Sequence, residues 1–286
     1  MPIVSDSNER LLEALREIEA WENDQKDLWF WEKLGRLPFM LLDKLTPKFI
    51  QAKLGQAVDE VGGFIQNGGK YLVSEKTITS KLARNAEAVE MDASLSGSDV
   101  VLTVEDCASL PLAVMDRTAA ELKSSRTAMA TVQGATTGIG GIFTLAIDIP
   151  AILGLSLKII QEIAICYGYN PKLKEERIFA VKVMQFASSD IVGKKAILDE
   201  LIAYGTESEG QGSHMLSQLQ GWREVVNVYR DNFGLKKLFQ LIPIAGIVFG
   251  AFINRSTLND VAEAATMLYR KRRVLVKLKE GGGSAT

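Results

Sequence analysis

The sequence predicts an all-α protein, a compact bundle of many helices with two glycine-rich apolar helices in its core. Apolar residues recur at helical spacing, and helix N-cap residues precede several of these segments. Sustained apolar–polar alternation is absent, and Asn-Gly or Asp-Gly hairpin signals are few. We therefore expect residues 1–279 to form one domain, with any subdomain joint in the polar loop 205–213 and a flexible Gly-rich tail at 280–286.

Composition excludes several function classes. The 286 residues carry 33 Lys and Arg against 35 Asp and Glu, a formal charge of −2, so no overall field recruits nucleic acid or an anionic bilayer, and any such binding must be local. Only Cys107 and Cys166 are present, which is typical of a reducing compartment. The N-terminus is acidic where a signal peptide is basic, so we expect a cytoplasmic protein that can be peripheral at the inner membrane.

The first predicted helix follows Ser7-Asn8 and places Leu11, Leu12, Leu15, Ile18 and Trp21 at helical spacing. The next clear start signal is Thr103-Val-Glu-Asp106, which resembles a capping box and predicts a helix running to about Gln133. Farther along, Asn170-Pro171 ends one helix and begins another. Ser256 is expected to cap a separate last helix.

Two apolar segments, 139–157 and 238–253, are the candidates for membrane contact. The second has about 16 residues, or about 24 Å of helix, whereas a spanning helix needs roughly 20 residues for a hydrocarbon core of about 30 Å. Burial in a helical core is therefore the favoured interpretation. The alternative is a hairpin that enters one leaflet or covers a membrane partner.

Glycine pairs at G-x-x-x-G spacing accompany both apolar segments, at Gly134–Gly138 and Gly246–Gly250. This spacing puts two glycines on one helix face and allows a second backbone to approach closely. Gly141 belongs to the same glycine-rich turn as Gly138. That turn lacks the G-x-x-x-x-G-K-[ST] pattern of a phosphate loop and follows a predicted helix, so we expect a tight helix-to-helix turn.

Asp148 is a lone acid among apolar residues, and it precedes Pro150. A buried carboxylate must be hydrogen-bonded, paired or neutralised. Pro150 cannot donate the usual helical hydrogen bond, so a kink is expected, with Asp148 capping the amides of the restarted turn. The functional alternative is an acid that faces a ligand cavity or a partner.

Common catalytic patterns are missing from the sequence. Glu162 lies about 21 Å along the helix from Asp148, too far for a paired-carboxylate site, and is expected to pair with another helix or lie on the surface. His214 is the only histidine. No C-x-x-C, H-E-x-x-H, G-x-S-x-G or S-x-x-K pattern occurs, so we predict no catalytic residue, metal site or cofactor.

One basic cluster stands near the C-terminus, and its members are Arg270, Lys271, Arg272, Arg273 and Lys277. Such a run is typical of a solvated helix end, where cations are favourable near the helix dipole. The alternative is contact with anionic lipid headgroups.

Several sequence blocks together resemble the EcsC family. They lie in order along residues 9–275: Ala14–Trp21, Gln133–Gly141, Asp148-Ile-Pro150, Leu155-Ser-Leu157, Tyr167–Asn170, Ile242–Gly246 with Gly250 and Asn254, and Ala262–Arg273. The family is named after a gene beside an ABC transporter, and it has no established catalytic residues to carry over. The resemblance thus implies a helical accessory protein.

We expect an accessory or interaction protein, and the sequence favours a binding function over a catalytic one. Its expected place of action is the cytoplasmic membrane face in a transport or envelope process, with a transporter or an anionic membrane surface as partner. The first alternative is a binder of lipid or another apolar ligand, with a cavity beside Asp148 and the Gly246–Asn254 helix. The second is a hydrolase that uses Asp148 as an acid.

Overall fold

The computed structural model describes residues 6–26, 59–60, 62–68, 73–88, 102–138, 145–188, 194–195, 197–201 and 243–283. Within these ranges the chain forms helices and no strand, which confirms the all-α prediction. The principal helices are α1 (Asn8–Lys26), α4 (Glu75–Ala88), α5 (Val104–Cys107), α6 (Leu112–Gly138), α7 (Leu145–Cys166), α8 (Lys174–Ser188) and α12 (Pro243–Gly283). Gly141, His214 and the predicted joint at 205–213 lie outside the described residues.

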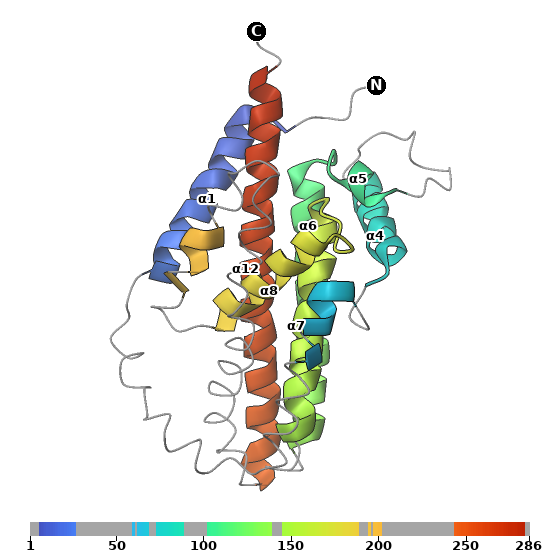
Figure 1. The fold of residues 1–286 in the computed structure, drawn as a ribbon, viewed down its shortest axis with the longest axis vertical. Helices are drawn as coiled ribbons and strands as arrows, with labels where there is room; N and C mark the ends of the chain where they lie inside the picture. Colours follow the sequence, from blue (N-terminus) through green and yellow to red (C-terminus); the bar gives the residue numbers. More distant parts are fainter. Residues whose placement is uncertain are drawn as a thin grey trace.

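Three long helices, α6, α7 and α12, form the centre of the bundle (Figure 1). Asp116 and Lys123 of α6 contact Arg270 and Glu263 of α12, so these two helices run in opposite directions. The α6–α7 pair is antiparallel as well. The C-terminal end of α6 and the N-terminal ends of α7 and α12 consequently lie at one end of the molecule.

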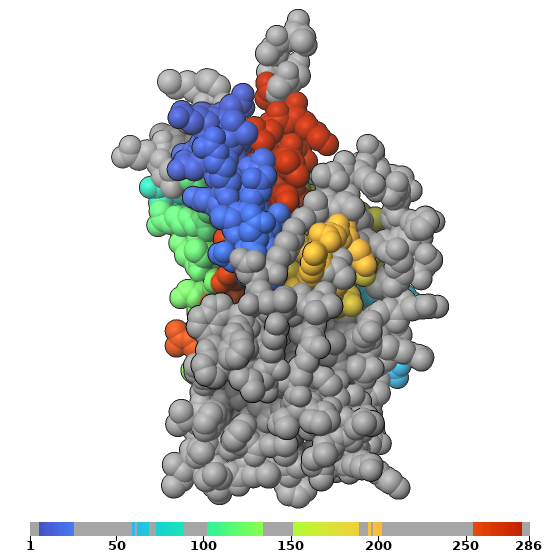
Figure 2. All heavy atoms as spheres, turned by 90° about the vertical axis from the view of Figure 1, so that its left-hand side faces the viewer, coloured from blue at the N-terminus to red at the C-terminus, as the bar shows by residue number. Residues whose placement is uncertain are grey.

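Helix α1 packs along the C-terminal half of α12, as Figure 2 shows from the side. The Ser7 hydroxyl accepts a hydrogen bond from the Arg10 amide, which confirms the predicted start. Leu11, Ile18 and Trp21 are buried on α12's side of the bundle, whereas Leu12 is 46% exposed. The helix is therefore amphipathic as expected, and its apolar stripe is narrower than predicted because Leu12 is not part of it.

The predicted capping box at Thr103 is present, but it starts a different helix from the expected one. The Thr103 hydroxyl accepts from the Asp106 amide, and the Asp106 carboxylate accepts from the Thr103 amide. The capped helix α5 has four residues. Pro111 lies just before the first residue of α6, where a missing N–H is tolerated. The Leu112 amide donates a hydrogen bond to the carboxylate of Asp6, which is distant in the sequence, at 3.0 Å.

The last helix corrects two predictions. Helix α12 is continuous from Pro243 to Gly283, so Ser256 lies inside it and does not cap a new helix. No proline or glycine stands between Gly250 and Gly281, so nothing local breaks the hydrogen-bond ladder. The tail predicted from residue 280 is helical as far as Gly283. Gly281 packs closely on α1, since a Cβ there would lie 3.1 Å from the Asn8 side-chain oxygen.

The C-terminus of α7 ends in a tight turn formed by the Tyr-Gly-Tyr-Asn block. Gly168 adopts a φ of +74°, and the Tyr169 amide donates to the Ala164 carbonyl at 2.9 Å. This left-handed glycine with its long return hydrogen bond is a Schellman motif. A Cβ on Gly168 would lie 2.5 Å from the Ala108 Cα, so the turn also lets α7 end directly against the α5 region.

Candidate functional site

The basic cluster of α12 lies inside the bundle. The side chains of Arg270, Lys271, Arg272 and Lys277 are between 12% and 14% exposed, and Arg273 is buried. Each of these cations contacts oxygen atoms of the protein. This placement differs from the solvated helix end that the sequence suggested. Lipid contact by these residues stays a prediction, and it would require their intramolecular partners to be replaced.

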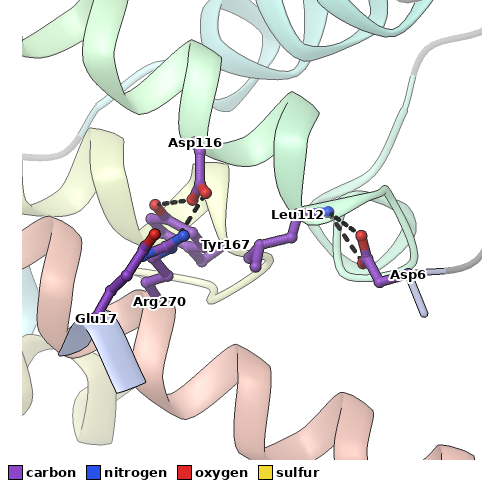
Figure 3. A network of polar contacts seen from close by, with 6 residues as sticks. All are labelled: Asp6, Glu17, Leu112, Asp116, Tyr167 and Arg270. Atoms are coloured by element: carbon purple, nitrogen blue, oxygen red, sulfur yellow. Dashed lines mark hydrogen bonds and ion pairs between the residues drawn. The ribbon is translucent and has the colours of Figure 1, made fainter. Parts of the chain in front are cut away.

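Arg270 is the centre of a polar network that joins three helices and the exit of α7 (Figure 3). Its guanidinium donates to Glu17 of α1 at 2.7 Å and to Asp116 of α6 at 3.1 Å. The Tyr167 hydroxyl donates to the other Asp116 oxygen at 2.8 Å. Burial raises the pKa of the Asp116 carboxyl, and the Arg270 charge offsets this only in part.

Arg272 occupies an aromatic enclosure. It forms a bidentate ion pair with Glu176 of α8, with nitrogen–oxygen distances of 2.8 Å and 2.6 Å. Its guanidinium carbon lies 4.0 Å from the ring centre of Tyr169 and 4.4 Å from that of Phe179. Burial alone would lower the pKa of Arg272, but the hydrogen bonds and charge of Glu176 outweigh it, so the pKa lies above its ordinary value.

The remaining cations of the cluster bind helix ends and the N-terminal segment. Arg273 donates to the Tyr167 and Gly168 carbonyls, the last acceptors of α7. Lys271 contacts both Glu22 oxygens at 2.7 Å. Lys277 contacts the Asp6 carboxylate and the Leu110 carbonyl, each at 2.7 Å. The cluster thus holds the start of the chain, α1 and the end of α7 on α12.

Glu162 was predicted to pair with another helix or to lie on the surface. The structure shows that it pairs with another helix. Its carboxylate accepts two hydrogen bonds from Arg126 of α6, at 2.7 Å and 2.6 Å. The Glu162 side chain is 3% exposed. The contact joins the middle of α6 to the C-terminal part of α7.

The other predicted site residues lie toward the opposite end of the molecule. Gly138 is the last residue of α6, and Gly246 and Gly250 lie in the first turns of α12. Asp148 and Pro150 belong to the first turns of α7, which continues as helix through Pro150, and the kink stays a prediction. Near a helix start, proline removes a single hydrogen bond to the preceding turn, which a helix tolerates. The side chains around these residues lie outside the described part, so the roles predicted for them remain predictions.

Asn254 of α12 is the one predicted site residue at this end whose side chain is described. It is fully buried, and neither its amide oxygen nor its amide nitrogen has a hydrogen-bond partner among the described residues. An unpaired buried amide costs free energy, so a residue of this kind needs an explanation beyond packing.

Charges are unevenly distributed along the described parts of the three central helices. The helical stretches 127–138, 145–157 and 243–254 contain one ionisable residue, Asp148. We call these three stretches the uncharged end. The ion pairs described above join residues outside these three stretches. Among the described helices none has both the length and the hydropathy of a membrane span, and within the same ranges no three metal-binding side chains gather.

Sequence reasoning singled out the α12 cations but missed the acids that pair with them. Asp6, Glu17, Glu22, Asp116 and Glu176 come from four separate segments, and no local pattern links them to residues 270–277. Asp116 alone could have been singled out as a buried acid, because it follows Val114 and Met115 in an apolar stretch.

The helical fold, together with the order of sequence blocks between Ala14 and Arg273, defines the class of protein. The chain belongs to the EcsC protein family, whose model matches residues 12–274. It is 55% identical to the Bacillus subtilis (strain 168) protein called "Uncharacterized protein YdbA", over 96% of this chain and 97% of that protein. It is 29% identical to "Protein EcsC" of the same strain, over 64% of this chain and 73% of that protein. No solved structure matches the chain.

Proposed function

We propose that the protein is an accessory protein that acts by binding at the cytoplasmic face of a membrane, in a transport or envelope process. One observation carries this proposal: the three central helices place their uncharged stretches at the same end of the molecule. The charged groups of the other end bind one another instead of forming an open site. An uncharged end on a charged body is suited to an apolar environment such as a bilayer or a membrane protein.

Membrane flotation tests the proposal. Purified protein is mixed with vesicles of phosphatidylcholine, with and without phosphatidylglycerol, at low and high salt. We expect the protein to float with the vesicles, and to bind those that contain anionic lipid more tightly at low salt. Recovery in the dense fraction under every condition would overturn the proposal of direct membrane binding.

The buried amide of Asn254 favours a second candidate, a binder of lipid or another apolar ligand with a polar group. Such a ligand would supply the hydrogen bonds that both amide atoms lack among the described residues. Native mass spectrometry of the purified protein checks this candidate. A ligand mass that the Asn254→Leu variant loses would support it, and a ligand-free mass for the unaltered protein would contradict it.

A further inference from the structure

We propose that α1 is an autoinhibitory helix, which covers a face of α12 that binds an anionic bilayer. The covered face consists of Arg270, Lys271, Val274 and Lys277. This inference rests on the proposed membrane function and adds to it the residues that bind the lipid and the element that regulates them. In the described structure the cations of this face are bound to acids, and most of these acids belong to the N-terminal segment.

Residues 6–22 supply an acid to each cation of the covered face. Three ion pairs with nitrogen–oxygen distances of 2.7 Å join this segment to α12: Asp6–Lys277, Glu17–Arg270 and Glu22–Lys271. The other two cations of the cluster are bound by α8 and by the end of α7. If the N-terminal segment moves away, Lys271 and Lys277 lose their only acids among the described residues, whereas Arg270 keeps Asp116. Movement of one segment therefore frees cationic charge and leaves the rest of the cluster in place.

Helix α1 lies on the outside of the bundle, along the C-terminal half of α12 (Figures 1 and 2). Its outward side chains, among them Glu13 and Glu19, are exposed. The Glu17 side chain is 56% exposed although it binds Arg270 (Figure 3). The helices α6, α7 and α12 pack directly on one another, so their contacts do not depend on α1. An anionic surface that binds the same cations more tightly than α1 does can therefore replace α1.

The covered face combines basic and apolar side chains. Residues 270, 274 and 277 lie on one side of α12, because they are spaced by four and three positions. Val274 lies between the cations and is fully buried in the described structure. A helix face of this kind is suited to an anionic bilayer, where each base near the headgroups raises the affinity roughly fivefold. The uncharged end contains no cation, so a preference for anionic lipid requires a basic face elsewhere.

An engineered disulfide tests whether α1 must leave. A Cβ at Gly281 would lie 3.1 Å from the Asn8 side-chain oxygen, so positions 8 and 281 are within reach of a disulfide. The variant that combines Asn8→Cys with Gly281→Cys is oxidised to hold α1 on α12 and then reduced to release it. Cys107 and Cys166 are buried and do not compete. In flotation with phosphatidylglycerol vesicles, the oxidised protein should bind at least about tenfold more weakly than the same protein after reduction. The single-cysteine variants are the controls and should not respond to reduction.

Charge variants test the inference without a cross-link. Glu17→Gln combined with Glu22→Gln removes two acids from the covered face. Glu13→Gln combined with Glu19→Gln removes the same charge from exposed positions of α1 and is the matched control. The first double variant should bind phosphatidylglycerol vesicles at least about fivefold more tightly than the second, because its cations are held less firmly by α1. Circular dichroism checks that both variants keep their helical content.

Hydrogen exchange followed by mass spectrometry identifies the helix that moves. When phosphatidylglycerol vesicles are added to the unaltered protein, the amides of α1 should lose protection and those of α8 should keep it. Inorganic phosphate at the same phosphate concentration should leave α1 protected. An equal loss of protection with inorganic phosphate would assign the covered face to a free anion and overturn the bilayer as its ligand.

The outcomes separate the two proposals. Absence of flotation in every variant overturns the membrane function itself. Flotation that is equal for the oxidised and the reduced protein, or equal for the two double variants, keeps the membrane function and overturns the autoinhibition by α1. Unchanged protection of α1 in the presence of bound vesicles overturns it as well.

Discussion

At the scale of single residues, buried ion pairs connect helices that are far apart in the sequence. Glu162 is 3% exposed, and its only charge partner among the described residues is Arg126, which is 17% exposed. The pair has bidentate geometry, which gives strong and directional hydrogen bonds. Removing one partner leaves the other charge buried without compensation.

The Arg126→Ala variant should therefore lose about 3 kcal/mol of unfolding free energy, because the Glu162 carboxylate then remains buried and unpaired. Urea unfolding followed by circular dichroism measures the loss. The matched control is Arg117→Ala, whose partner Glu121 lies on the same helix and whose pair is about half exposed. That change should cost less than about 0.5 kcal/mol. Equal losses in both variants would contradict the account of the buried pair.

At the scale of elements, the ends of helices were harder to predict than their existence. The capping box at Thr103 was found from its spacing, but the helix that it starts stops at Cys107. The first amide of α6, that of Leu112, is bound by Asp6, which lies 106 residues earlier in the sequence. Likewise, Ser256 satisfied the local rule for a cap, yet α12 continues through it. Local sequence patterns indicate several possible helix ends, and packing against distant segments determines which of them occur.

The turn after α7 gives a prediction at this scale. Gly168→Ala should destabilise the protein by about 2 to 3 kcal/mol, because alanine is strained at a φ of +74° and its Cβ would overlap Ala108. Thermal and urea unfolding measure the effect.

Gly63→Ala is the matched control for that variant. Gly63 is helical, and a Cβ there meets nothing within 4 Å, so alanine should be neutral or stabilise by up to about 1 kcal/mol. If both variants unfolded at the same denaturant concentration, the turn would not require its glycine.

At the scale of the whole molecule, the described parts of the three central helices separate a charged half from the uncharged end. The α12 cations with their acids tie α1, α6, α7 and α8 together, and Figure 1 places this half away from the first turns of α7 and α12.

Asp148 is the single ionisable residue of the uncharged end, so the proposed membrane function gives a prediction for its charge. Asp148→Asn should bind vesicles about tenfold more tightly, because the neutral amide costs less in hydrocarbon than the carboxylate. Asp24→Asn, at an exposed position of α1, removes the same charge outside the uncharged end and corrects for electrostatic repulsion by anionic lipid. Flotation at a series of lipid concentrations gives both affinities. Equal affinities would place Asp148 outside the hydrocarbon, and a loss of hydrolytic turnover in Asp148→Asn would favour the hydrolase alternative.

The sequence by itself determined the helical class, the start of α1, the turn after α7 and the two apolar segments, because helical periodicity, capping residues and hydropathy are local properties. Only the tertiary structure decided that the Arg270–Lys277 cluster is an internal set of ion pairs, since its acids come from Asp6, α1, α6 and α8. It also decided that the N-terminal parts of α7 and α12, which belong to these apolar segments, share one end of the molecule. Both results depend on which helices run antiparallel, and that is set by packing over distances that no local pattern contains.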